Sequence, residues 1–340
     1  MTAAPRPAPI REIENIDRLR FHAEIRPSCQ PAIFRGLGRD WPAVQAGRTS
    51  PEAAIDYLKR FSQPGPVSAM LGEPEIEGRF FYTADLKKLN FQRGTTPLDP
   101  FLDRLLRDQQ TVRPYAMAVQ SLALPEHLPG FVEENQIDLL DEQIVPRIWL
   151  GNSIRVATHY DRMENIGIVM TGRRRFTVFP PEQVANLYPG PFELTPAGVV
   201  ISLVDIAAPD LGRYPRYAEA LAAAQTALLE PGDAIYLPFQ WWHGVESLDS
   251  VNAFVNYWWN PAPDHLGSPD DVLLLALTSV RGLPDDQRAA WRALFDHYIF
   301  EVNGDPAAHL PPDVKGVLGP ITPEQVARTR AALLQSLSRW

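Results

Sequence analysis

Residues 155–161 read Arg-Val-Ala-Thr-His-Tyr-Asp, and this stretch decides the expected fold. An apolar, β-branched run ends in two residues that can bind a metal, His159 and Asp161. Side chains two residues apart on a strand point to the same face, so His159 and Asp161 can project together into a β-structure. The stretch therefore predicts a strand that brings a histidine and a carboxylate to one site.

A distant stretch supplies a third group of the same kind. Residues 237–243 read Leu-Pro-Phe-Gln-Trp-Trp-His, and His243 stands at the start of another expected strand. Two histidines and one carboxylate leave three coordination positions open, which is the ligand set of non-haem Fe(II) oxygenases. Structural zinc prefers four closed ligands. A histidine in a β-rich core can also be merely hydrogen-bonded, so this pattern alone leaves both interpretations open.

Short apolar and aromatic runs recur between residues 145 and 260, each closed by a turn signal such as Pro231-Gly232-Asp233. Such runs predict strands, and about eight of them are typical of a double-stranded β-helix or jelly roll. One helix, residues 214–229, is expected among them because the segment is rich in Ala and Leu. The expected strands are 147–150, 155–159, 166–170, 175–179, 199–204, 234–238, 243–248 and 252–259.

The expected fold class is mainly β with flanking α, a jelly roll or cupin-type double-stranded β-helix. The expected division is a flexible arm (1–15), an N-terminal helical and strand elaboration (16–144), the β-helix core (145–260) and a C-terminal helical region (261–340). The C-terminal helices carry apolar stripes that either pack on the barrel or form a homodimer interface. Outside the core, helices are expected at 51–61, 97–108, 272–280, 284–302 and 323–338, and strands at 66–71 and 115–119.

Composition restricts the partners and the compartment. The formal net charge is −9, which disfavours an extended nucleic-acid surface, so no nucleic-acid partner is expected. Cys29 is the single cysteine, which excludes an intrachain disulfide and a multi-cysteine metal site and makes the cytoplasm the expected location. No stretch approaches the roughly 20 apolar residues of a membrane span.

The motifs around the three candidate ligands occur in one order, and together they resemble the JmjC/cupin-like Fe(II)- and 2-oxoglutarate-dependent oxygenases, in particular their asparaginyl hydroxylase branch. The similarity covers about residues 145 to 260 and is faint outside. It implies the JmjC type of double-stranded β-helix. The matching stretches are Trp149-Leu150-Gly151, His159 to Asn165, Gly172 to Pro181, Asn186 to Pro189, Pro231 to Pro238, Trp241-Trp242-His243 and Asn256-Tyr257-Trp258.

Residue by residue, the resemblance makes His159, Asp161 and His243 the metal ligands and the catalytic centre. It assigns Arg174, where the asparaginyl hydroxylase has Lys, to the distal carboxylate of 2-oxoglutarate; an arginine can pair with a carboxylate through two hydrogen bonds. A register slip of one residue would instead place Arg173 or Arg175 there. The resemblance also places Asn165 and Asn256 near the iron and the cosubstrate, where an amide can donate without adding charge.

Several positions depart from the family pattern. Val156 stands where many relatives have a cosubstrate-binding Thr, and Thr158 is expected to point elsewhere. Tyr115 is the candidate for a tyrosine that meets the same carboxylate from an upstream strand. Gly167 replaces a bulkier residue, which is expected to widen the pocket or change substrate fit. Trp241 and Trp242 either line a substrate cleft or belong to the core.

The resemblance implies an oxygenase that uses Fe(II), 2-oxoglutarate and O₂ to hydroxylate a protein side chain or a small molecule, with release of succinate and CO₂. Two alternatives stay open at this point. One is a cupin-like metal- or ligand-binding protein without oxygenase turnover, which Val156 and the uncertain Tyr115 would favour. The other is a metal-dependent hydrolase or isomerase on the same barrel.

Overall fold

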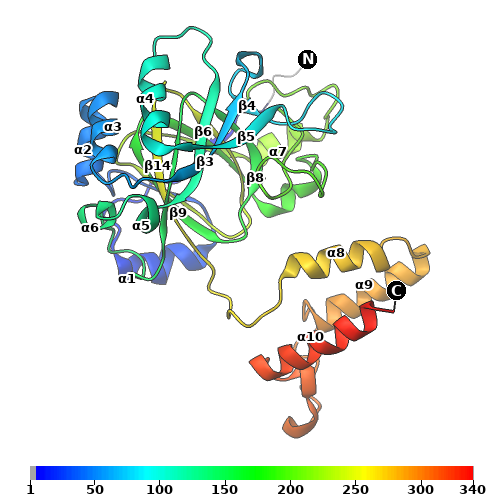
Figure 1. Ribbon diagram of the computed structural model, residues 1–340. Coiled ribbons are helices and arrows are strands. Elements are labelled where there is room, and N and C mark those ends of the chain that lie inside the picture. Colours follow the sequence, from blue (N-terminus) through cyan, green and yellow to red (C-terminus); the bar gives the residue numbers. More distant parts are fainter. Residues whose placement is uncertain (1–4, 340) are drawn as a thin grey trace. The chain divides into compact units, whose positions relative to one another are not determined.

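The computed structural model describes residues 5–339, which divide into two compact units, one ending at Asn260 and the other beginning at Pro261. The N-terminal unit contains two β-sheets, and the C-terminal unit is helical (Figure 1). The eight-stranded sheet of the N-terminal unit has the order β2 (Ala32–Phe34), β12 (Ala234–Leu237), β9 (Glu164–Thr171), β14 (Asn252–Trp259), β7 (Pro146–Gly151), β6 (Ala116–Ala123), β3 (Pro66–Gly72) and β5 (Phe91–Pro97). The six-stranded sheet has the order β1 (Ala8–Pro9), β11 (Gln225–Leu229), β10 (Arg174–Phe179), β13 (Trp242–Ser247), β8 (Arg155–Tyr160) and β4 (Arg79–Phe80).

The strands from β7 to β14 form the jelly roll that the sequence predicts. Strands β7, β14, β9 and β12 are neighbours in one sheet, and β8, β13, β10 and β11 are neighbours in the other. The chain changes sheet at nearly every connection, and the antiparallel pair of β10 and β11 is the point where it turns back. This alternation makes a double-stranded β-helix and confirms the predicted fold class.

An apolar core joins the two sheets. Phe176 and Val245 come from the six-stranded sheet, whereas Val169 and Phe254 come from the eight-stranded sheet, and all four are buried in one cluster. The rings of Phe176 and Phe254 lie 5.7 Å apart between their centroids. Burying these side chains fixes the strand register, because a slip of one residue would turn them out of the core.

The outer face of the eight-stranded sheet packs against helices. Ala43 and Val44 of α2, Ile55 and Leu58 of α3 and Leu102 of α4 share a buried cluster with residues of β9 and β14. Local signals set the helix starts: α2 and α3 each begin with proline, and the Ser50 hydroxyl caps α3 by accepting from the Ala53 amide. The helices of this unit are α1 (Arg18–Arg20), α2 (Pro42–Thr49), α3 (Pro51–Lys59), α4 (Leu98–Asp108), α5 (Leu124–His127), α6 (Phe131–Glu134) and α7 (Tyr217–Ala223).

A partly buried ion pair holds the N-terminal segment against the barrel, beside the strand that follows Asp161. The guanidinium of Arg26 donates to both oxygens of Glu164, at 3.0 and 3.1 Å, and the Tyr236 hydroxyl donates to Glu164 at 2.9 Å. Glu164 is the first residue of β9, so these bonds hold the start of that strand. The loop that carries Asp161 is thereby anchored on its C-terminal side.

Three sequence predictions are wrong in part. The helix expected at 214–229 covers only α7, and Gln225–Leu229 is β11, because these residues complete the sheet beside β10. The strand expected at 199–204 is reduced to isolated bridges at Ile201 and Ser202. The arm expected at 1–15 is ordered from Ala8 on, since β1 pairs with β11 and Ile10 is buried; residues 1–4 of that prediction lie outside the described residues.

The C-terminal unit contains α8 (Pro269–Ser279), α9 (Asp285–Tyr298) and α10 (Pro323–Leu337), close to the predicted helices. A complete capping box starts α10, with reciprocal bonds between Thr322 and Gln325. Large apolar side chains of all three helices are not covered by the rest of the unit. None of the described helices is long and apolar enough to span a membrane.

Candidate metal and cosubstrate site

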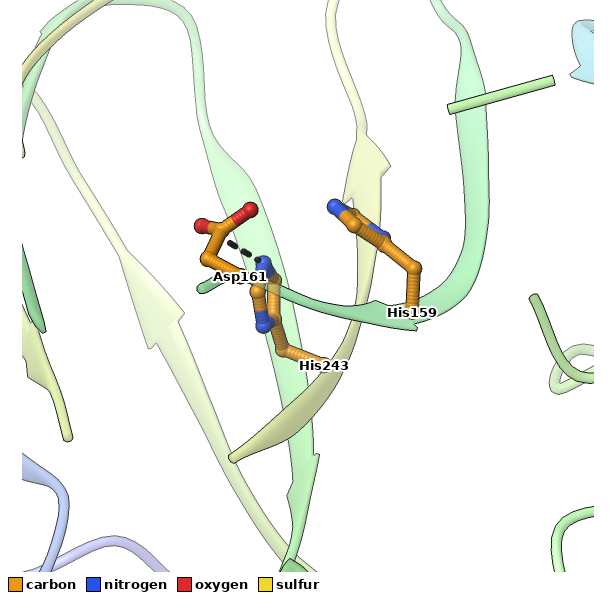
Figure 2. A group of neighbouring side chains, drawn as sticks. All are labelled: His159, Asp161 and His243. Carbon is orange, nitrogen blue, oxygen red and sulfur yellow. Dashed lines mark ion pairs between the residues drawn. The ribbon is translucent and has the colours of Figure 1, made fainter. Parts of the chain in front are cut away.

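Antiparallel pairing of β8 with β13 brings the two histidines together. His159 and His243 are directly opposite each other in this pair, and their ring centroids are 4.4 Å apart. Asp161 follows immediately after β8. One ligand atom from each of His159, Asp161 and His243 can be chosen so that all three lie within 4.8 Å of one another (Figure 2). The structure therefore brings together the three ligands that the sequence predicts.

Backbone carbonyls orient both imidazole rings. The Nδ1 of His159 lies 2.9 Å from the carbonyl oxygen of Ala157, and the Nδ1 of His243 lies 3.0 Å from that of Trp241. A carbonyl oxygen only accepts hydrogen bonds, so each Nδ1 carries a proton, and the lone pair of a neutral ring is then on Nε2. This is the arrangement that a metal-binding histidine requires.

The surroundings of His159 also favour its neutral form. Burial, followed by the proximity of His243, lowers the pKa of His159 to about 4. A neutral imidazole is the form that binds a metal ion, and His159 is in that form at neutral pH. The donor set of two imidazole nitrogens and one carboxylate fits an Fe(II) ion that keeps open positions.

Two donors hold the Asp161 carboxylate. Its Oδ2 accepts from the indole Nε1 of Trp258 at 3.1 Å and from the amide of Asn165 at 3.3 Å. The same oxygen lies 3.7 Å from the Nε2 of His243 (Figure 2). These bonds fix the rotation of the carboxylate, so that it faces the two histidines.

The two predicted asparagines form a chain that ends at Asp161. Asn256 accepts from the Nε1 of Trp149 at 2.8 Å and donates to the side-chain oxygen of Asn165 at 3.2 Å. Asn165 in turn donates to Asp161. The structure thus places Asn165 and Asn256 beside the metal ligands, and their contact with a cosubstrate stays a prediction.

Arg174 is a buried cation that has no carboxylate partner in the part of the chain that the structure describes. It is 7% exposed, and among the described residues its Nε has no hydrogen-bond partner. Its guanidinium makes one long hydrogen bond there, 3.5 Å from Nη2 to the Trp149 carbonyl. Its guanidinium carbon lies 4.8 Å from the ring centre of Phe254. Burial lowers the pKa of Arg174 to about 9, so the group is still charged at neutral pH. A buried cation in an apolar wall favours an anionic ligand.

The neighbouring arginines point the other way. Arg173 pairs with Asp249 at 2.8 Å, and Arg175 pairs with Glu246 at 3.1 Å, both at the surface. The alternation of side chains along β10 therefore selects Arg174 for the interior and excludes the register slip.

Two of the predictions about the cosubstrate pocket are wrong. Tyr115 is 36% exposed and lies beside Glu73 and Arg104 at the surface, so its side chain does not join Arg174. Gly167 does not widen the pocket, because the ring of Phe254 fills the space next to it: a Cβ on Gly167 would lie 1.9 Å from Cζ of Phe254.

The structure also shows where Val156, Thr158 and the two neighbouring tryptophans lie. Val156 packs against the apolar core, whereas Thr158 faces away from it, toward Gly244 and Ile206. Trp241 and Trp242 are both buried: Trp241 donates to the Cys29 carbonyl, and Trp242 packs on Tyr160. Both tryptophans therefore belong to the core and not to a substrate cleft.

Sequence reasoning missed three side chains of the site. Trp149 and Trp258 end the hydrogen-bonded chains to Asp161, and Phe254 lies beneath Arg174. Trp149 and Trp258 stand in the matching motifs, and Trp149, Phe254 and Trp258 share inner-face positions on β7 and β14. That shared face was the available signal, but it identifies the residues only when the strand pairing is known.

The Gly167–Phe254 contact predicts a substitution effect. Gly167→Ala should lower the free energy of unfolding by about 1–3 kcal/mol, because the new methyl group overlaps a buried ring. Gly94→Ala is the matched control, since nothing lies within 4 Å of that Cβ position, and it should change stability by less than about 0.5 kcal/mol. Urea unfolding measures both. Adding Phe254→Leu to Gly167→Ala should restore part of the loss; purely additive losses would contradict the contact.

Comparison with known proteins agrees with this geometry. A family model described as a Cupin-like domain matches residues 18–265. The lysine-specific demethylase JMJ31 of Arabidopsis thaliana is 24% identical, over 76% of this chain and 52% of that protein. The tRNA wybutosine-synthesizing protein 5 of Gallus gallus is 24% identical, over 82% of this chain and 90% of that protein. HSPB1-associated protein 1 of Homo sapiens is 34% identical, over 37% of this chain and 26% of that protein.

The chain spans about half the length of the plant demethylase and about a quarter of the human protein. The family's cofactors are Fe(II), 2-oxoglutarate and O₂, as the motifs predict, and the ligand set for the metal is present. The family match covers most of the chain, including the whole jelly roll and the His159–Asp161–His243 site. The chain therefore belongs to the Cupin-like domain family of JmjC-type, 2-oxoglutarate-dependent oxygenases.

Proposed function

We propose that this chain is an Fe(II)- and 2-oxoglutarate-dependent oxygenase that hydroxylates a protein side chain or a small molecule and releases succinate and CO₂. The observation that carries the proposal is Arg174, a buried cation in the same barrel as the His159–Asp161–His243 triad, with no carboxylate partner between residues 5 and 339. A dicarboxylate such as 2-oxoglutarate can meet both, since one end reaches the metal and the other the guanidinium.

The residues of the chain have distinct parts in this activity. His159 and His243 would hold Fe(II) through Nε2, and Asp161 through its carboxylate; the bound metal supplies the oxidising chemistry. Trp258 and Asn165 keep the carboxylate oriented. Arg174 binds the distal carboxylate of 2-oxoglutarate, and the apolar walls around Phe254 exclude water from that end.

The substrate class is open between the kinds that the relatives suggest. One relative is named a lysine-specific demethylase and another a tRNA wybutosine-synthesizing protein. The net charge of −9 favours a protein or small-molecule substrate over tRNA. The absence of a nucleic-acid partner and the cytoplasmic location both stay predictions.

Turnover of the cosubstrate tests the proposal. The purified chain with Fe(II), O₂ and 2-oxoglutarate should form succinate, and His159→Ala should abolish this. Arg174→Ala should raise the KM for 2-oxoglutarate by about a hundredfold, because it removes a buried charged hydrogen-bond partner. Arg173→Ala is the control: Arg173 is a surface residue paired with Asp249, and its loss should leave KM within about twofold.

The outcome also separates the alternatives. Metal binding without succinate formation under any condition would favour a metal- or ligand-binding protein. A KM that Arg174→Ala leaves unchanged would remove Arg174 from the cosubstrate site.

We also propose that the C-terminal helices form a homodimer. Leu266, Val272, Leu333 and Leu337 line an apolar groove of about 470 Å³ within the C-terminal unit, between α10 and the start of α8. Exposed apolar side chains, among them Leu274 and Leu334, continue along these helices. A surface of this kind on one helical unit fits a second copy of itself, because a twofold axis pairs the same patch with itself.

Sedimentation of the full chain measures the oligomeric state. The chain should sediment as a dimer, and Leu334→Glu should convert it to a monomer. Leu19→Glu, at an exposed position of the N-terminal unit, should leave the dimer intact. A monomeric wild-type chain would contradict the proposal.

A further inference from the structure

Arg147 is a second cation on the inner face of the barrel. It lies on β7 directly opposite Asn256 of β14, and residues directly opposite in an antiparallel pair project from the same face. Trp149, two residues further along β7, is on this face too, since its indole donates to Asn256. The side chain of Arg147 therefore shares the face that holds the metal site.

Arg147 lies close to the metal end of the barrel, which is the end where His159, Asp161 and His243 are. Asn256, its cross-strand partner, donates to Asn165, which donates to the metal ligand Asp161. Arg174 lies further in, against Phe254 and the Trp149 carbonyl. Arg147 is thus directly opposite Asn256, the residue that is linked to Asp161 by hydrogen bonds through Asn165.

Arg147 has no carboxylate partner in the part of the chain that the structure describes. Its Nη1 donates to the Ser121 carbonyl at 2.9 Å and to the Ser121 hydroxyl at 3.3 Å, and these are its hydrogen bonds among residues 5–339. The side chain is half-buried. A half-buried guanidinium with only neutral partners retains the capacity to bind an anion through its Nε and Nη2 edge.

An irregularity in β6 brings the hydrogen-bond partner of Arg147 into place. Ser121 adopts a left-handed conformation with φ of 57°, inside strand β6. The β6–β7 pairing shifts register there, between Val119 and Leu122. Such bulges re-aim backbone groups and occur next to functional sites, and a non-glycine residue with positive φ is in a strained conformation. Here the bulge turns Ser121 toward Nη1 of Arg147.

We infer that Arg147 binds a carboxylate of the substrate that is oxidised. This inference rests on the proposed function and names its substrate class: an acid, either free or presented as an Asp or Glu side chain of a peptide. Arg174 binds the distal carboxylate of 2-oxoglutarate in the proposed function. Arg147, which has no carboxylate partner among the described residues, is then available to the substrate. The guanidinium holds the acid next to the metal end of the barrel.

Anaerobic binding to the Fe(II)-loaded chain, with 2-oxoglutarate saturating Arg174, tests the inference. The probes are two matched pairs, L-aspartate with L-asparagine and L-glutamate with L-glutamine, each as the free amino acid derivative with its α-amino and α-carboxyl groups blocked, and within an otherwise identical capped peptide. The members of a pair then differ only in the side-chain carboxylate. Fluorescence of Trp149 and its neighbours reports binding. The acid of at least one pair should bind about tenfold more tightly than its amide, and the free and peptide forms identify the source of the carboxylate.

Arg147→Gln should remove this preference, and Arg147→Lys should retain part of it. Arg93→Gln is the matched control. Within residues 5–339, Arg93 also donates hydrogen bonds only to a neutral group, the Pro196 carbonyl, but it lies on β5 at the far edge of the sheet. Equal binding of acid and amide, no binding of any acid, or an unchanged preference in Arg147→Gln would each overturn the inference. Acid binding that depends on Arg147 without succinate formation would instead refute the proposed function.

Discussion

The pairing of β8 with β13 is the constraint on which the site depends. It sets His159 opposite His243 and leaves Asp161 at the end of the strand, so one antiparallel register defines three ligands. The rest of the barrel preserves this register. Phe176, Val245 and Phe254 fill the space between the sheets, and a slip of one residue would expose them and separate the ligands.

The side chains of the metal triad are held by hydrogen bonds from the backbone or from neighbouring strands. Carbonyls hold the histidines, and tryptophan and asparagine side chains hold Asp161. Arg174 differs from them, because among residues 5–339 its Nε has no hydrogen-bond partner and its guanidinium pairs with no carboxylate. Because Gly167 has no side chain, the ring of Phe254 occupies the space beside it, and this ring lies under the guanidinium of Arg174. An unpaired buried charge is costly in the empty protein, and an anionic ligand removes that cost.

The sequence predicted what depends on local spacing and order. His159 and Asp161 share a face because they are two residues apart, and the ordered motifs identified His243 and Arg174. Features that depend on distant pairing were missed or wrong. Gln225–Leu229 is a strand because it pairs with β10, although its composition predicts a continuation of the preceding helix. Gly167 could not be interpreted without Phe254, and Tyr115 lay where the motifs no longer fix the register.

If the triad and Arg174 together form one site for Fe(II) and 2-oxoglutarate, anaerobic absorption spectroscopy detects it, because 2-oxoglutarate bound to Fe(II) gives a weak visible charge-transfer band. This band should appear when 2-oxoglutarate is added to the Fe(II)-loaded chain, and Asp161→Ala should lack it. An iron-loaded chain that shows no band at saturating 2-oxoglutarate would refute the joint site.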